Sequence, residues 1–386
     1  MRYLHLLIPS LALVALLGCD VVNETGTEVQ PASDRVQPQA QAVEASALRP
    51  VSARPLTGQA SVLLVGRLEH PLTGALEAQA YLSLEYPTVV LPNLADYQLR
   101  AELRLVRQAT YGDTTGTLRL RLRLLTQPWS DARFRADTTL PAGEVVGLSA
   151  PFSSRDSLVR IPLSASWTAL FQAAASSEAE FTSRIHGFAL ELLEGQAAVG
   201  FNAARSFVRI WYSREGVRDS LSLLIKGRAN AVRRLSPAPP SALIQGGVGS
   251  RVLASFSPSL PPKAAVHRAV VWLYARPIEP QPGRFWEPLR SLELYTSTES
   301  GEPDRLLAIG NYREREGGFA FSSSALSAHI QELVLGRVPA RPLLVMAASE
   351  KATLGWVVLI GPEGEVGRRP RLELFWSSAP AAMTER

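Results

Sequence analysis

The chain is poor in lysine and almost free of cysteine. Only Lys226, Lys263 and Lys351 are lysines among 40 basic residues in 386, so the other 37 are arginines. Such a bias is typical of a GC-rich genome, or of heat adaptation through the planar, multi-donor head of arginine. The net charge of +5 is modest, and no cluster of basic residues with interleaved aromatic residues occurs. We therefore expect no nucleic acid among the partners.

The single cysteine stands at the end of an apolar N-terminal run, Leu4–Leu17, which follows Arg2. Leu16-Leu17-Gly18-Cys19 has the form of a lipobox, which makes residues 1–18 a lipoprotein signal peptide and Cys19 the acylated first mature residue. In a lipoprotein the thiol of this cysteine is diacylated and the freed amine is acylated as well. These three acyl chains exceed what stable membrane anchoring needs. The alternative is an ordinary signal peptide, or a short membrane helix, with an incidental cysteine. The apolar run is short for the roughly 20 residues that span a bilayer.

Acylation of Cys19 would leave the folded part of the chain without a thiol. This excludes disulfides, thiolate metal sites and cysteine nucleophiles. Residues 19–57 are rich in Val, Gln, Ala, Glu, Pro and Ser and show no apolar periodicity. We expect them to form a disordered tether between the lipid and the first domain.

A first unit over residues 58–215 shows the alternation of apolar and polar residues that is typical of half-buried strands. It is clearest in Leu99–Arg107 and Thr117–Leu125. With the turn residues Tyr111–Gly116 between them, these segments predict an antiparallel hairpin with an apolar inner face and an arginine outer face. One short helix is expected over Trp167–Ala175, with Ser166 as its N-cap.

A second unit over residues 243–378 repeats this plan, with a helix over Ala325–Leu335 and a closing segment, Glu373–Ser377, that matches Arg209–Ser213. Residues 216–242 are expected to connect the units and to end in the stiff proline cluster Pro237–Pro240. Residues 379–386 form a tail. The predicted fold class is therefore all-β, with two tandem antiparallel β-sandwich (jelly-roll-like) domains that each carry one short helix.

Several short motifs occur at intervals along nearly all of the mature chain. They are the lipobox, Leu63–Gly66, Tyr111–Asp113, Gln245–Gly249 and Leu260-Pro261. In this combination the chain resembles a family of uncharacterised envelope lipoproteins common in the Bacteroidota, defined only as a domain of unknown function. The resemblance implies two linked β-sandwich domains and export to the outer membrane or the cell surface. It implies no catalytic residues.

Motifs for catalysis and for metal or phosphate binding are missing. The mature chain has four scattered histidines without zinc-ligand spacing, namely His70, His186, His267 and His329. Neither a G-x-S-x-G elbow nor a phosphate-binding glycine loop occurs. A glycosidase needs only two facing carboxylates, but Glu102, Glu191, Glu293 and Glu373 follow the alternating pattern of solvent-side charges. We expect no enzymatic activity, no cofactor and no metal.

Two features are candidates for binding. One is a row of arginines, formed by Arg119, Arg121 and Arg123 and extended across the predicted hairpin by Arg100 and Arg104. Side chains two apart on one strand face lie roughly 6.6 Å from each other, a spacing that suits anionic head groups or acidic glycans. The alternative is a solvated outer face that Glu102 partly neutralises.

The other candidates are Trp129 and Trp286, which lie in loop-like contexts and are candidates for stacking on sugars. The alternative is that they close the ends of the sandwich cores. Trp211, Trp272, Trp356 and Trp376 lie in predicted strands and are expected in the core.

The sequence therefore predicts a lipid-anchored protein of the cell envelope with a non-catalytic interaction or structural role. The outer membrane is the expected location, on its periplasmic or surface face, with envelope proteins or surface polysaccharide as partners. A glycan- or anionic-polymer-binding lipoprotein is the second possibility. A jelly-roll enzyme that acts on polysaccharides is the third.

Overall fold

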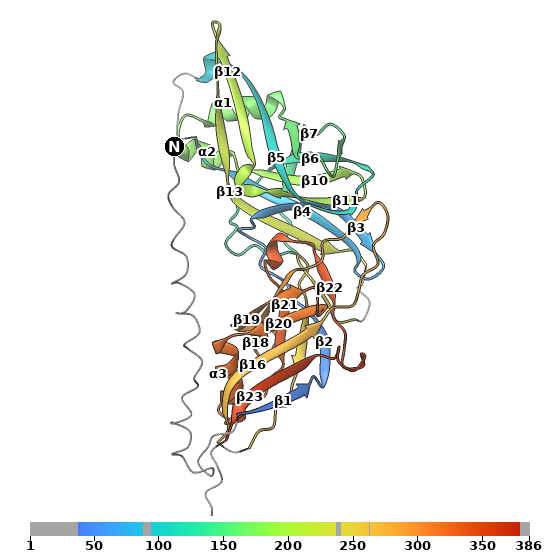
Figure 1. Cartoon of the computed structure of the whole chain (residues 1–386). Coiled ribbons are helices and arrows are strands. Elements are labelled where there is room, and N and C mark those ends of the chain that lie inside the picture. The colour runs from blue at the N-terminus through green and yellow to red at the C-terminus, as the bar shows by residue number, and fades with distance from the viewer. Residues whose placement is uncertain (1–37, 88–93, 237–240, 262, 379–386) are drawn as a thin grey trace, which may run out of the picture.

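Two large antiparallel sheets, one after the other along the molecule, make up the fold (Figure 1). The computed structural model describes residues 38–87, 94–236, 241–261 and 263–378. The signal peptide with Cys19, the proline cluster 237–240 and the tail 379–386 lie outside these residues. Within them, no helix is long and apolar enough to cross a membrane.

The first lobe is the 12-stranded sheet. Its strands are β3 (Val62–His70), β4 (Gly74–Leu84), β5 (Gln98–Asp113), β6 (Thr117–Leu125), β7 (Ala142–Leu148), β8 (Phe152–Ser153), β9 (Leu158–Pro162), β10 (Phe188–Glu194), β11 (Ala197–Asn202), β12 (Phe207–Arg214), β13 (Val217–Arg234) and β17 (Arg284–Phe285). The long strand β13 pairs with β12 through its first half and with β4 through its second, so the row of strands closes into a ring around one apolar core.

The second lobe is the 11-stranded sheet, with an apolar core of its own. Its strands are β1 (Pro38–Glu44), β2 (Ala47–Ser52), β14 (Leu243–Gln245), β15 (Ser250–Ser255), β16 (Ala265–Tyr274), β18 (Ser291–Ser297), β19 (Pro303–Arg313), β20 (Gly318–Ser322), β21 (Leu343–Ala347), β22 (Trp356–Val358) and β23 (Arg371–Ser377).

The first lobe contains two α-helices where one was predicted. α1 (Ala165–Ala174) begins two residues earlier than expected, because Ser164 and not Ser166 caps it. α2 (Glu178–Arg184) was missed, although Ser177 accepts a hydrogen bond from the main-chain nitrogen of Glu180, as in a capping box. The predicted helix of the second lobe is present as α3 (Ser324–Val334).

The two lobes repeat one pairing scheme. In the first, β3 pairs with β4 and β11, and β10 pairs with β4 and β6; in the second, β14 pairs with β15 and β22, and β21 pairs with β15 and β18. Likewise β5 lies between β9 and β12, and β16 lies between β20 and β23. The closing segments matched in the sequence, β12 and β23, therefore occupy equivalent places.

The predicted tether is wrong for residues 38–57, because 38–44 and 47–52 are strands of the second lobe. β1 pairs with β23 over seven residue pairs, and β2 pairs with β15. In the first lobe β13 lies beside β12 and β4. In the second lobe β1 and β2 together occupy the equivalent place, beside β23 and β15. The prediction failed because most of their side chains are exposed, so that no apolar face recurs. Only Val43 and Leu48 reach the core.

The predicted connecting segment 216–242 is also wrong over most of its length, since β13 belongs to the first sheet. Within this segment the apolar residues of Leu221–Ile225 predict one strand, and these residues lie in the first half of β13. The remainder of β13 was missed because it crosses from one neighbour to the other with an irregularity between Ile225 and Arg228.

The predicted hairpin of Leu99–Arg107 with Thr117–Leu125 does not form, although both segments are strands. β5 pairs with β9, β11, β12 and β17, whereas β6 pairs with β7, β8 and β10. The strand continues through the expected turn to Asp113, whose Oδ1 then accepts hydrogen bonds from the main-chain nitrogens of Thr115 and Gly116. The chain therefore leaves β5 for a different part of the sheet.

The lobes are joined by a continuous apolar contact. Leu64, Tyr111 and Val232 of the first lobe pack in one cluster with Ala352 and Leu354 of the second. β17 extends from the second half of the chain and pairs with β5. The molecule is consequently elongated, with the β12–β13 hairpin at one end and the start of β1 at the other (Figure 1).

Candidate ligand-binding face

The outer side of four neighbouring strands, β9, β5, β12 and β13, carries arginines and aromatic rings in register. Arg100 on β5 lies opposite Trp211 on β12, and Arg104 lies opposite Phe207. Directly opposite side chains in an antiparallel pair have Cβ atoms about 4.5–5.5 Å apart. We call this set the first arginine–aromatic face. Its members are Arg100, Arg104, Arg160, Phe207, Arg209, Trp211 and Arg218.

The guanidinium groups of this face lie on the aromatic rings. The Cζ of Arg104 is 5.3 Å from the ring centroid of Trp211 and 6.0 Å from that of Phe207, and the Cζ of Arg100 is 5.8 Å from Trp211. Such cation–π contacts restrict the long side chains. Arg104 already donates from its Nε to Glu102, whereas the N–H groups at the edge of the Arg100 guanidinium have no acceptor among the described residues. A planar anion takes two such groups at once.

The face has one acidic residue, Glu102, in the middle of β5. It is 6% exposed, and its Oε1 lies 2.7 Å from the Nε of Arg104 and 3.9 Å from that of Arg160. The Nη1 of Arg209 donates to the Oγ of Ser222 over 2.9 Å. Five arginines against one glutamate give the face a formal net charge of +4.

Two arginines of the face are free to meet a ligand. Arg100 and Arg218 are exposed, and neither has an acidic partner among the described residues. A shallow hollow of about 450 Å³ lies between them, with Trp211, Tyr212 and Asp219 in its lining. The hollow continues the face toward the tip of the β12–β13 hairpin.

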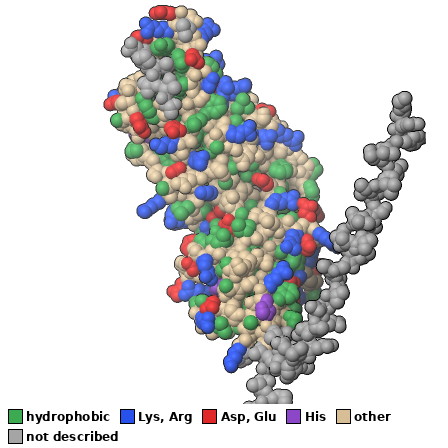
Figure 2. Space-filling model, turned by 60° about the vertical axis from the view of Figure 1, so that its left-hand side comes forward, with side chains coloured by type: hydrophobic (Ala, Val, Ile, Leu, Met, Phe, Trp, Pro, Cys, Tyr) green, Lys and Arg blue, Asp and Glu red, His purple; other side chains and the backbone are tan. Residues whose placement is uncertain are grey.

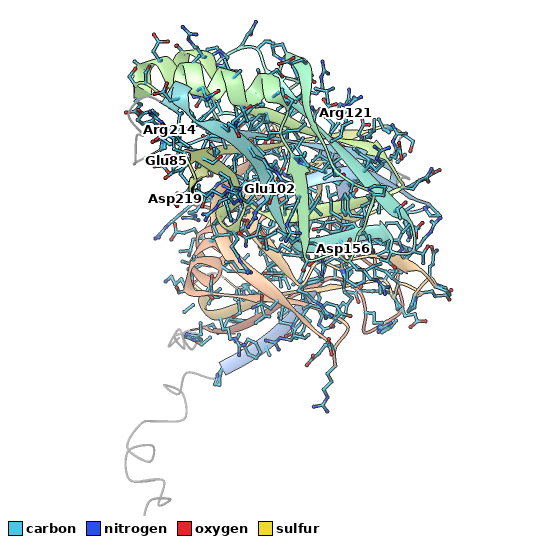
Figure 3. All side chains as sticks on the ribbon, turned by 90° about the horizontal axis from the view of Figure 1, so that it is seen from above. Glu85, Glu102, Arg121, Asp156, Arg214 and Asp219 are labelled. Atoms are coloured by element: carbon cyan, nitrogen blue, oxygen red, sulfur yellow. The ribbon has the colours of Figure 1, made fainter. Side chains whose placement is uncertain are left out.

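The predicted arginine row is divided by the structure into two separate groups. Arg100 and Arg104 belong to the first arginine–aromatic face, whereas Arg119, Arg121 and Arg123 lie on β6 beside β10. Figure 3 shows Glu102 of β5 and Arg121 of β6 apart from each other on different strands.

The group on β6 is largely paired within the protein. Arg119 lies 3.0 Å from Glu194 and Arg121 2.5 Å from Glu191. Arg123 donates to the main-chain oxygens of Ala142 and Gly143. These contacts use the charges and donors that a ligand would need, so the β6 group is the weaker candidate.

Trp129 and Trp286 are both half-buried by packing. The Nε1 of Trp129 donates to the main-chain oxygen of His186 over 2.9 Å, and its ring lies 5.8 Å from that of Phe134. Trp286 lies at the lobe junction, with its ring 4.4 Å from that of His70. Trp286 also lines a hollow of about 540 Å³ together with Ile278 and Phe285.

Trp211 and Trp272 were expected in the core, but both are half-exposed. Trp356 and Trp376 are buried as expected. Phe207, Arg209 and Trp211 follow each other at every second residue, which was the available signal for one mixed outer face.

The acidic residues considered for catalysis serve other partners. Glu102 and Glu191 pair with arginines, as described above. Glu373 pairs with Arg371 at 2.8 Å, and Glu293 accepts a hydrogen bond from the hydroxyl of Tyr295. Among the described residues, no three His, Cys, Asp or Glu side chains gather where they could hold a metal ion.

Basic side chains are spread over both lobes on the face seen in Figure 2, with apolar side chains between them. No protein-family model matches the chain, and no curated protein matches it either.

Proposed function

We propose that the chain is a lipid-anchored, non-catalytic binding protein of the cell envelope, and that it binds an acidic polysaccharide on the first arginine–aromatic face. The observation that carries this proposal is the alternation of guanidinium groups and aromatic rings across β5 and β12. Guanidinium groups take carboxylates or sulfates in a bidentate manner. Rings beside them offer an apolar surface to the faces of the sugars.

The direction of the chain supports a binding role away from the anchor. Pro38 and Ala265 both lie opposite Ser377, at the end of the second lobe that is remote from the first. Eighteen residues lie between Cys19 and Pro38, which bounds the distance between these two residues to about 65 Å. The second lobe would therefore lie nearer the membrane, and the lobe with the first arginine–aromatic face would lie farther from it.

For the fold, we propose that each lobe is a β-sandwich of jelly-roll type, in keeping with the resemblance to Bacteroidota-type envelope lipoproteins. The antiparallel pairing within each lobe and the separate apolar core of each lobe support this. The proposed location is the outer membrane, on its periplasmic or surface side. An interaction role is favoured over a purely structural one because Arg100 and Arg218 are exposed and have no acidic partner among the described residues.

Binding to polygalacturonate at low salt tests the proposal, with neutral dextran as the control polymer. In the variant Arg100→Gln/Arg218→Gln, the affinity should fall roughly 30-fold, at about 1 kcal/mol for each basic group near an anionic surface. Added salt should weaken the wild type in the same direction.

The matched control is Arg49→Gln/Arg133→Gln. It removes the same charge from two exposed arginines that have no acidic partner among the described residues. An equal loss of affinity in both variants would show that only the net charge of the protein matters, and would contradict binding at the first arginine–aromatic face.

A further inference from the structure

The second lobe carries the same cross-strand pairs at equivalent positions. β16 and β23 correspond to β5 and β12 in the pairing scheme. Arg268 of β16 lies opposite Phe375 of β23, and the matched positions in the first lobe are Arg100 and Trp211. In both lobes, therefore, a guanidinium on the inner strand of the pair faces an aromatic ring on the closing strand.

A second pair follows four residues along in each lobe, with its members exchanged between the strands. Trp272 of β16 lies opposite Arg371 of β23, where the first lobe has Arg104 opposite Phe207. Between the two pairs, each lobe has one carboxylate, Glu373 in the second and Glu102 in the first.

The distances in the second lobe are those of the first. The Cζ of Arg268 is 5.7 Å from the ring centroid of Phe375, and that of Arg371 is 5.8 Å from Trp272. Arg313 of β19 covers Trp272 at 5.2 Å. Glu373 accepts a hydrogen bond from the indole Nε1 of Trp272 over 3.0 Å and so fixes the ring.

Part of this set is accessible. Arg268 and Arg313 are exposed, and neither has an acidic partner among the described residues. Phe375 is 41% exposed. Three arginines against one glutamate leave a net charge of about +2, which is complementary to an anionic polymer although weaker than that of the first lobe.

We infer that the second lobe carries a second binding surface for the same class of ligand, an acidic polysaccharide. It consists of Arg268, Trp272, Arg313, Arg371 and Phe375, and we call it the second arginine–aromatic face. The inference rests on the proposed function. Its basis is that guanidinium–ring pairs recur at corresponding register positions on the equivalent strands of both lobes, although the ring and the charge of the second pair have exchanged strands.

Two surfaces on one chain would give the protein a stronger hold on a polymer than on a fragment. A short acidic oligosaccharide would occupy each face separately. A long chain that reaches both faces would bind the second in an intramolecular step, which raises the overall affinity without any new contact.

Titration of the full-length mature protein in detergent with tetragalacturonate, followed by calorimetry, tests the inference. The expected stoichiometry is two per chain, falling to one in Arg268→Gln/Arg313→Gln and also to one in Arg100→Gln/Arg218→Gln. For long polygalacturonate, either variant should lose affinity at least tenfold. The variant with all four substitutions should not bind.

All four arginines are exposed and lack acidic partners among the described residues, so we expect the variants to fold. Arg268→Lys/Arg313→Lys keeps the charge but loses the planar guanidinium, and its stoichiometry is measured in the same way. A stoichiometry of one that Arg268→Gln/Arg313→Gln leaves unchanged would overturn the second face and leave the proposed function intact. Absence of binding by the wild type would overturn the proposed function itself.

Discussion

Asn230 of the first lobe donates a hydrogen bond from its Nδ2 to the main-chain oxygen of Lys351 in the second lobe, over 3.0 Å. The same amide donates to the main-chain oxygen of Val62, and its Oδ1 accepts from the nitrogen of Leu64, both over 2.8 Å. Asn230 is fully buried. One side chain thus satisfies three main-chain groups and ties the lobes together.

Asn230→Leu should destabilise the protein by about 3 kcal/mol, because it leaves buried donors and acceptors without partners. The free energy of unfolding in urea measures this loss. Asn311→Leu, at an exposed position of β19, is the control and should change it little. Similar losses in the two variants would contradict the role assigned to Asn230.

Glu350→Gln should cost more. Arg251 is 5% and Glu350 6% exposed at the side chain, and the Nη2 of Arg251 lies 2.8 Å from Glu350. The variant leaves the buried guanidinium of Arg251 with the more exposed Glu302, 3.2 Å from its Nη1, as its remaining acidic partner, and breaking a buried pair from one side costs about 3–5 kcal/mol. The double variant Arg251→Met/Glu350→Leu should recover part of that loss in the same urea experiment. If the double variant is less stable than Glu350→Gln, this account of the pair is wrong.

The stability of the protein should fall below neutral pH, in part because of His70. Burial between the indole rings of Trp286 and Trp356, with a smaller effect of Arg284, lowers the pKa of His70 below its ordinary 6.5. The unfolded chain therefore binds a proton more readily than the folded one. The contribution of His70 to the free energy of unfolding is fully present above pH 6.5 and is lost as the pH falls from there toward the folded-state pKa.

His70→Gln removes this contribution and can still offer an acceptor to the main-chain nitrogen of Leu72, which His70 Nδ1 binds over 3.1 Å. The difference in unfolding free energy between pH 8 and pH 5 should be smaller in the variant than in the wild type. An unchanged or larger difference would remove His70 from the explanation.

Fragments cut at the unit boundaries expected from the sequence should not fold. A fragment 59–215 lacks β13, and a fragment 242–378 lacks β1 and β2, so each exposes unpaired strands on either side of a gap. The intact mature chain should melt in a single sharp transition. Cooperative melting of both fragments in circular dichroism would contradict this.

A synthetic peptide of residues 38–52 should restore the second lobe. When added to the fragment 242–378, it should pair with β23 and β15 and recover cooperative melting. A scrambled peptide of the same composition should have no effect.

Cys19→Ser should abolish lipid attachment, since Cys19 is the only thiol in the chain. Metabolic labelling with an alkyne fatty acid measures this directly. Label retained in the variant would disprove the lipobox assignment.

The sequence was most informative where one face of a strand is buried and the other is exposed to solvent. β6 and β12 were predicted for this reason, as was the correspondence between β12 and β23. Period-two patterns identify the strand and its faces, but they carry no information about which strand lies beside it. The pairing of β5 with β12 and not with β6 depends on contacts distant in sequence, and for that reason the arginine row was divided.

β1 was missed because an edge strand with mostly exposed side chains shows no apolar period. The second half of β13, which lies beside β4 in the closed ring, was missed because its residues are largely small or charged. Trp211 was assigned to the core because a tryptophan in a strand is usually buried there. Its actual environment depends on Arg100 and Arg104, which come from a strand about 100 residues earlier.

The antiparallel pairing of β1 with β23 has a mechanical consequence if the chain is anchored at Cys19 and held at its far lobe by a polymer. Tension would then reach the protein at Pro38, and the part of it directed along β1 would slide that strand against β23. Hydrogen bonds of an antiparallel ladder lie perpendicular to the strands, so the whole row would bear the load in shear instead of opening one bond at a time. The strand that joins the body to its anchor is thus arranged to resist detachment under force.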